Sequence, residues 1–168
     1  MYFEFLFVIG DYISTLSKRV AIYEWGIPVV LGITSGVLSY LNDANLLYNV
    51  IQSAVPIIAT LLGFTLAALT LFLTGNSKIE DAKKYMTEKK VSGKRISLYK
   101  LIVISYSYLI LIETILCIGY YIGILFPFIN NIYICVGINT IFIVLMLNVL
   151  FSTIRSITDL YFVITRHE

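Results

Sequence analysis

The stretch LILIETILCIG, residues 109–119, decides the fold class, because one carboxylate, Glu113, interrupts an otherwise almost entirely apolar run. The run belongs to a longer apolar segment over about 98–126. A helix needs about 20 apolar residues to cross hydrocarbon about 30 Å thick, so this segment can span a membrane. Glu113 then lies about 22 Å along the helix axis from Leu98, close to the bilayer midplane. An acid at that depth requires a partner or a function.

The composition of the whole chain points the same way. Hydrophobic residues make up 59% of the 168 residues and charged residues only 13%, whereas soluble domains have about 45–50% and about 25%. The mean hydropathy is +0.90. A soluble chain of this length could not bury so much apolar surface. The composition predicts an all-α integral membrane protein with a single domain, 1–168.

Three further segments resemble the segment 98–126 in length and in apolar character. Together they predict four membrane spans, at about 20–41, 50–74, 98–126 and 131–153. The joints after the first and third spans are short, which makes the spans that they connect antiparallel. The joint at 75–97 is long and polar.

The positive charges lie on one side of the predicted membrane topology. All 12 Lys and Arg residues avoid the two short joints, and they lie at positions 18, 19, 78, 83, 84, 89, 90, 94, 95, 100, 155 and 166. Cytoplasmic loops of membrane proteins carry an excess of Lys and Arg. The bias predicts that both termini and the 75–97 loop are cytoplasmic, which agrees with an even number of spans.

Two segments outside the spans have features of their own. In residues 1–19, Glu4, Asp11 and Lys18 recur at intervals of seven, which predicts an amphipathic helix in the cytoplasmic interface. The loop 75–97 predicts a short solvated helix that ends before Gly93. Its basic residues either set the topology or bind anionic lipids or a soluble partner; the candidate docking residues are Lys83, Lys84, Lys89, Lys90, Lys94 and Arg95.

Two pairs of glycines, Gly32 with Gly36 and Gly119 with Gly123, form small-xxx-small patterns within the spans. Small residues let helix backbones approach closely, and close packing drives helix association in lipid. The patterns serve packing either within one chain or between chains. The second alternative predicts a homo-oligomer.

No Lys or Arg lies in the core of a predicted span, so Glu113 has no expected ion-pair partner there. A central carboxylate costs roughly 2.5–3.5 kcal/mol on insertion scales. We expect it either to be protonated and bonded to Tyr108, Asn139 or Gln52, or to be ionised and face water. Either state gives an acid that binds or relays a cation. The alternative is a protonated acid that only joins two helices.

Glu24 lies near the start of the first span. Because a side chain this close to the interface can reach water, we expect it to extend to the surface or to pair with Lys18 or Arg19.

Motifs of enzymes and metal sites are absent from the sequence. It has no HExxH, no GxSxG and no glycine-rich phosphate loop, and its one histidine is His167. Cys117 and Cys135 lie in apolar runs, which favours buried thiols. We expect no enzyme activity, no metal, no cofactor and no direct nucleic-acid binding.

Residues 50–168 follow a recognisable order of motifs. Leu66-Ala67-Ala68-Leu69-Thr70 in the second span precede apolar residues, a glycine and a basic polar loop, and in the third span Tyr108 precedes Glu113 by five residues. The chain ends on Leu160-Tyr161, then Thr165-Arg166 and a glutamate. In these features it resembles the RexB phage-exclusion proteins, small inner-membrane proteins with four predicted spans. Its architecture also resembles KwaA, the four-span component of the Kiwa antiphage system.

The resemblance implies antiphage defence at the bacterial inner membrane. The resemblance to RexB implies ion conduction and depolarisation. The resemblance to KwaA implies an infection sensor that holds a cytoplasmic KwaB-like partner at the membrane. We therefore expect an oligomeric sensor or effector that perturbs the membrane or recruits a partner. The alternatives are a small proton-coupled transporter or channel and a non-conducting membrane anchor.

Overall fold

The computed structural model describes residues 4–41, 45–74, 77–125 and 132–165. Four of its helices are long and apolar enough to cross a membrane, and these candidate spans cover Lys18–Leu41, Asn49–Leu73, Leu98–Gly123 and Ile132–Phe162. The prediction of four helices that are long and apolar enough to span a membrane is confirmed.

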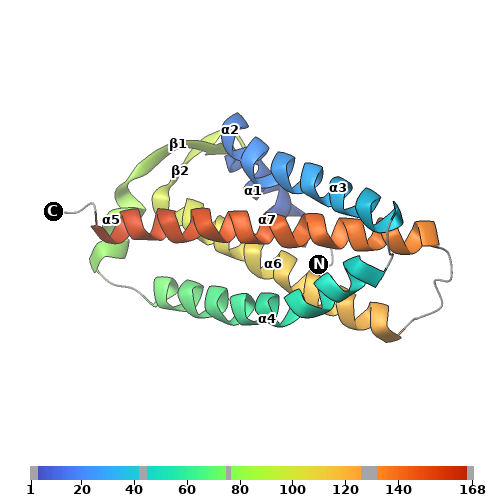
Figure 1. Ribbon diagram of the computed structural model, residues 1–168. Coiled ribbons are helices and arrows are strands. Elements are labelled where there is room, and N and C mark those ends of the chain that lie inside the picture. Colours follow the sequence, from blue (N-terminus) through green and yellow to red (C-terminus); the bar gives the residue numbers. More distant parts are fainter. Residues whose placement is uncertain (1–3, 42–44, 75–76, 126–131, 166–168) are drawn as a thin grey trace.

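The long helices lie side by side in one bundle (Figure 1). The first span combines α2 (Lys18–Ala21), a π-helical segment η1 (Ile22–Gly26) and α3 (Ile27–Leu41). The other spans are α4 (Asn45–Leu73), α6 (Leu98–Leu125) and α7 (Ile132–Thr165). α4 changes direction along its length (Figure 1), and it contains Pro56. Proline removes one helical hydrogen bond and clashes with the preceding turn, which bends a helix.

One end of the bundle carries the positive charges. The helix α5 (Ser77–Lys84) and the C-terminal part of α7 lie there, and two strands extend from it toward α2 (Figure 1). We call this the charged end. It unites the three groups of basic residues that the sequence placed on one side. The side of the membrane that it faces stays a prediction.

The fourth span is longer than the sequence predicted. Its predicted end was residue 153, but α7 continues to Thr165. The extension carries Arg155 on the same helix. Its guanidinium pairs with Glu24, and the apolar residues Ile154 and Ile157 on either side are exposed on the outer face of the bundle. The helix therefore remains part of the bundle beyond the first basic residue.

The predicted N-terminal helix is present as α1 (Glu4–Thr15). Val8, Ile9 and Leu16 pack against the main apolar core, and Tyr12 is fully buried in it. Phe5, Leu6, Phe7 and Ile13 are exposed on the other side. α1 thus packs on the bundle, mainly along α6. Its predicted position in the membrane interface is not tested by these contacts.

The loop at 77–97 contains more structure than the sequence predicted. The short helix is present as α5, but residues 86–97 form an antiparallel hairpin of β1 (Met86–Val91) and β2 (Lys94–Ser97). Ser92 and Gly93 form its two-residue turn and both have positive φ, 51° and 79°. Such turns match the twist of a hairpin and need residues that tolerate positive φ. Val91 and Ile96 join the main core, so the hairpin is packed onto the bundle.

The two glycine patterns differ in their surroundings. A Cβ on Gly32 would overlap the Val144 side chain, and one on Gly36 would overlap Thr140, so this pair brings α3 close to α7 within the chain. A Cβ on Gly119 would make only ordinary contact with Phe142, and one on Gly123 would have no neighbour within 4 Å among the residues that the structure describes. Among the described residues, a close approach of helices that excludes a side chain is found only at the first pattern.

Candidate functional site

A buried ion pair lies where η1 meets α7. Arg155 Nε lies 2.8 Å from Glu24 Oε1. The Glu24 side chain is fully buried and that of Arg155 is 19% exposed. Neither of these two atoms makes a directed hydrogen bond to any residue in the described ranges, so the contact is mainly Coulombic. Burying two charges costs several kcal/mol per ion before their attraction offsets it, so such pairs need further polar partners.

This pair corrects the prediction for Glu24. The partner is Arg155, and Lys18 and Arg19 are exposed. The side chain does not extend to the surface because it points inward from the π-helical segment. π-Helical turns are rare and occur frequently at functional sites. The first span changes its winding at the residue that carries the acid.

Tyr12 of α1 is a further polar partner of Glu24. Its hydroxyl donates to Glu24 Oε2 at 2.5 Å and lies 2.9 Å from Ser152 Oγ. Since the single phenolic hydrogen goes to Glu24, Ser152 is the donor in the second bond. Arg155 Cζ lies 5.1 Å from the centre of the Tyr12 ring, within the range of a cation–π contact. One tyrosine thus connects α1 to both members of the ion pair.

A second tyrosine extends the network across α6. Tyr108 stacks on Tyr12 with ring centroids 3.7 Å apart. Its hydroxyl donates to Asn148 Oδ1 at 2.6 Å, and Asn148 Nδ2 donates to the backbone carbonyl of Glu24 at 2.8 Å. Tyr108 and Asn148 are fully buried. We call Tyr12, Glu24, Tyr108, Asn148, Ser152 and Arg155 the polar network; it joins α1, η1, α6 and α7.

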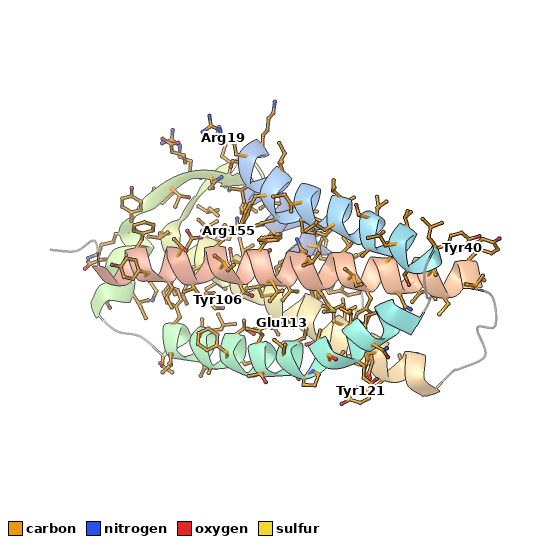
Figure 2. The ribbon with its side chains drawn as sticks, viewed as in Figure 1. Arg19, Tyr40, Tyr106, Glu113, Tyr121 and Arg155 are labelled. Atoms are coloured by element: carbon orange, nitrogen blue, oxygen red, sulfur yellow. The ribbon has the colours of Figure 1, made fainter. Side chains whose placement is uncertain are left out.

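Glu113 lies apart from the polar network, between α6 and α4. The side chain is fully buried, and Thr65 Oγ1 donates to Glu113 Oε2 at 2.6 Å. Glu113 Oε1 has no hydrogen-bond partner among the residues that the structure describes. Figure 2 shows Glu113 nearer the middle of the bundle and Arg155 nearer the charged end.

The predicted partners of Glu113 were wrong. Tyr108 bonds Asn148 instead, because it lies on a different face of α6, five residues from Glu113. Asn139 makes a weak contact with Cys135, with 3.8 Å between Nδ2 and Sγ. Gln52 is exposed on α4. Thr65 was missed because a threonine in an apolar span is usually bonded to its own helix. Thr65 Oγ1 also lies 3.1 Å from the Leu61 carbonyl oxygen and 3.0 Å from that of Leu62, but its single hydrogen goes to the closer Glu113.

The candidate docking residues lie on α5 and the hairpin. All are exposed except the half-buried Lys89, and they are Lys83, Lys84, Lys89, Lys90, Lys94 and Arg95. Lys83 Nζ lies 5.1 Å from the centre of the Tyr99 ring. No group of three or more metal-ligating side chains is found in residues 4–41, 45–74, 77–125 and 132–165. Cys117 and Cys135 are free thiols.

One sequence signal could have found the polar network. Asn148, Ser152, Arg155, Ser156 and Asp159 recur at helical spacing, which places them on one face of α7. The predicted fourth span ended at residue 153, so Asn148 and Ser152 fell inside the span and the other three residues fell after it. Tyr12 had no such signal, since a tyrosine near a membrane interface needs no special role.

No family model, curated protein or solved structure matches this chain.

Replacing Thr65 by valine is expected to lower the free energy of unfolding by about 1–3 kcal/mol, because it leaves both oxygens of a buried acid without a donor. Glu113→Gln should cost less in the Thr65→Val background than in the wild type, since the two residues share one bond. The measurement is reversible unfolding in mixed micelles. Thr60→Val is the matched control, because Thr60 is exposed and bonds only its own helix at Pro56. Equal losses for Thr60→Val and Thr65→Val would contradict the contact.

Tyr12 gives a pH prediction. Burial raises the pKa of Tyr12 above its ordinary value of 10.0, and the hydrogen bond to Glu24 acts in the same direction while Arg155 opposes it. Because the folded state holds the proton more tightly, stability is constant below pH 10 and falls as the unfolded chain loses the proton above it. Tyr12→Phe should reduce the alkaline slope of the unfolding free energy by about 1.4 kcal/mol per pH unit. Tyr85→Phe, at an exposed tyrosine, should keep the wild-type slope.

Proposed function

We propose that this protein is an inner-membrane sensor and effector of bacterial antiphage defence, and that α1 is its latch. The observation that supports this best is the burial of Tyr12 between Glu24, Arg155 and Tyr108. From the resemblance to RexB-like and KwaA-like proteins we infer that the stimulus is phage infection. The distribution of positive charge supplies the orientation, with the charged end in the cytoplasm.

The contacts of α1 suit a helix that can leave its site. Ser14 and Thr15 bond carbonyls within α1, and among the described residues only Tyr12 makes side-chain hydrogen bonds from α1 to other elements. Phe5, Leu6, Phe7 and Ile13 already face outward. The sequence pattern of α1 suits the membrane interface, which is the position of the released helix.

Release of α1 has two consequences for the rest of the molecule. It uncovers the polar network, and an exposed ion pair at membrane depth attracts water and perturbs the bilayer. It also removes part of the surface on which the hairpin packs, since Tyr12, Val91 and Ile96 belong to one core. The exposed basic residues of the hairpin then change position, which alters the surface that a soluble partner would bind. Membrane perturbation and partner recruitment thereby share one trigger.

The test is membrane potential and survival during phage challenge, in cells that express the wild type, Tyr12→Phe or Tyr85→Phe. Tyr12→Phe keeps the ring but removes the hydroxyl that holds α1. We expect it to depolarise cells before infection, whereas the wild type and Tyr85→Phe depolarise only after infection. A Tyr12→Phe strain with the wild-type resting potential and wild-type protection would contradict the latch. Absence of protection by the wild type against every phage tested would contradict the defence role.

The oligomer and the partner are tested separately. Copurification in mild detergent, followed by mass measurement, gives the number of copies and reveals a bound cytoplasmic protein. Exchange of Lys90, Lys94 and Arg95 for glutamine should release a partner held by the hairpin, because these side chains are exposed at its turn. A partner that remains bound to this variant would contradict docking at the hairpin.

The pair of Glu113 and Thr65 favours a second candidate, a proton-coupled carrier. A fully buried acid with one donor and one unpartnered oxygen can bind and release a proton as the helices move. Vesicles with an imposed pH gradient would show proton flux through the wild type and a loss of that flux in Glu113→Gln. Equal flux in both would exclude Glu113 from transport.

A further inference from the structure

A stripe of polar side chains runs along α7 from the polar network to the charged end. Asn148, Ser152, Arg155, Ser156 and Asp159 share one helical face over about 16 Å. Asn148 and Ser152 are 0% exposed, the Arg155 side chain is 19% exposed and Ser156 2%. Asp159 is half-buried. The stripe therefore begins in the core and opens toward the surface.

α6 presents a matching hydroxyl group to this stripe. α6 and α7 are antiparallel, and Tyr108 of α6 bonds Asn148 of α7. One turn nearer the charged end, this pairing brings Ser105 to the level of Ser152. Ser105 is 2% exposed. Two serines and an asparagine are unusual contents for the centre of an apolar helix interface in a membrane protein.

Several polar atoms along this interface have no hydrogen-bond partner in the described part of the chain. Ser105 Oγ, Ser156 Oγ and Arg155 Nη2 are buried and make no hydrogen bond to any residue that the structure describes. Each buried polar group without a hydrogen bond costs about 1–3 kcal/mol. Three such groups in succession would be a large penalty if the interface were dry. Buried waters typically bind groups that lack protein partners.

We propose that these atoms line a chain of water molecules that connects the charged end with Glu24. Asp159, half-buried on α7, is at its mouth. Glu24, with Arg155 and Tyr12, is at its inner end. Beyond the polar network the core consists of apolar side chains such as Ile112, Leu116 and Met146. Water and protons therefore reach Glu24 from the charged end alone, whether or not α1 acts as a latch.

Water-edited solid-state NMR on the wild-type protein in bilayers tests the path. Magnetisation passes from water to nearby protein sites, so signals of Ser105 and Ser156 should appear several-fold faster than that of Thr153. Thr153 is the matched control, because it is buried on the same helix and its hydroxyl bonds Val149. Transfer to Ser105 and Ser156 that is as slow as transfer to Thr153 would overturn the proposal.

Thiol labelling tests the direction of access. In a background with Cys117 and Cys135 replaced by alanine, Ser156→Cys should react with a thiolate-specific reagent, because a thiol ionises where water reaches it. Ile157→Cys, adjacent and exposed on the outer face, should not. Reaction of Ser156→Cys should occur from the side of the charged end. Equal reactivity of the two cysteines, or reaction of Ser156→Cys from the opposite side only, would contradict one-sided access.

Discussion

Replacing Arg155 by methionine is expected to lower the free energy of unfolding by about 3–5 kcal/mol, because it leaves the buried carboxylate of Glu24 without its counter-charge. Methionine keeps much of the length and apolar character of the arginine stem, so the loss of stability measures the effect of removing the charge. The measurement is reversible unfolding in mixed micelles. Arg19→Met is the control, since Arg19 is exposed at the same end of the bundle, and a change within about 0.5 kcal/mol is expected there.

A double-mutant cycle separates the ion pair from general loss of packing. Glu24→Gln removes the charge of the partner while retaining its shape. The double variant Glu24→Gln, Arg155→Met should be more stable than the sum of the single losses predicts, with a coupling near the upper end of the usual range of about 0.5–3 kcal/mol. Strictly additive losses would mean that the two charges do not interact, and the polar network would lose its centre.

Replacing Gly32 by leucine is expected to cost about 1–3 kcal/mol, because overpacking of a tight contact forces side chains or backbone to move. A Cβ at this position would overlap the Val144 side chain and lie 3.5 Å from the backbone oxygen of Thr140. Gly123→Leu should change the stability of the chain little, because a Cβ there has no described neighbour within 4 Å. Unfolding in mixed micelles measures both.

The same two variants separate packing within the chain from packing between chains. If Gly119 and Gly123 form a contact between copies, Gly123→Leu should reduce the size of the detergent-solubilised particle while the folded chain stays intact. Equal stability losses for Gly32→Leu and Gly123→Leu would contradict the difference between the two glycine patterns.

The four spans could be predicted because span length and hydropathy are local properties. Each apolar run reports its own helix without knowledge of its neighbours. The end of the fourth span was predicted too early because a basic residue usually marks the membrane surface, whereas Arg155 is compensated by Glu24 from the first span. That compensation depends on two helices far apart in the sequence. The hairpin at 86–97 did have a local signal, the turn pair Ser92-Gly93, but the charged residues before it favoured a solvated helix that ends before Gly93.

The candidate site was predictable only in part. Glu113 stood out because a lone acid in an apolar run is conspicuous, but its donor, Thr65, looked like any threonine in a span. Tyr12 and Glu24 each had an ordinary explanation near an interface. Their importance arises from the packing of α1 against α6, which brings Tyr12 onto Tyr108. No periodicity within one segment carries that information.

Hydrogen exchange of α1 in lipid nanodiscs tests most directly whether Tyr12 holds this helix on the bundle. The amides of residues 8–15 should exchange slowly in the wild type and in Tyr85→Phe. In Tyr12→Phe they should exchange much faster, while the amides of α6 keep their protection, because the loss is local to the latch. Unchanged protection of α1 in Tyr12→Phe would contradict the account, since the polar network would then not be what keeps α1 in place.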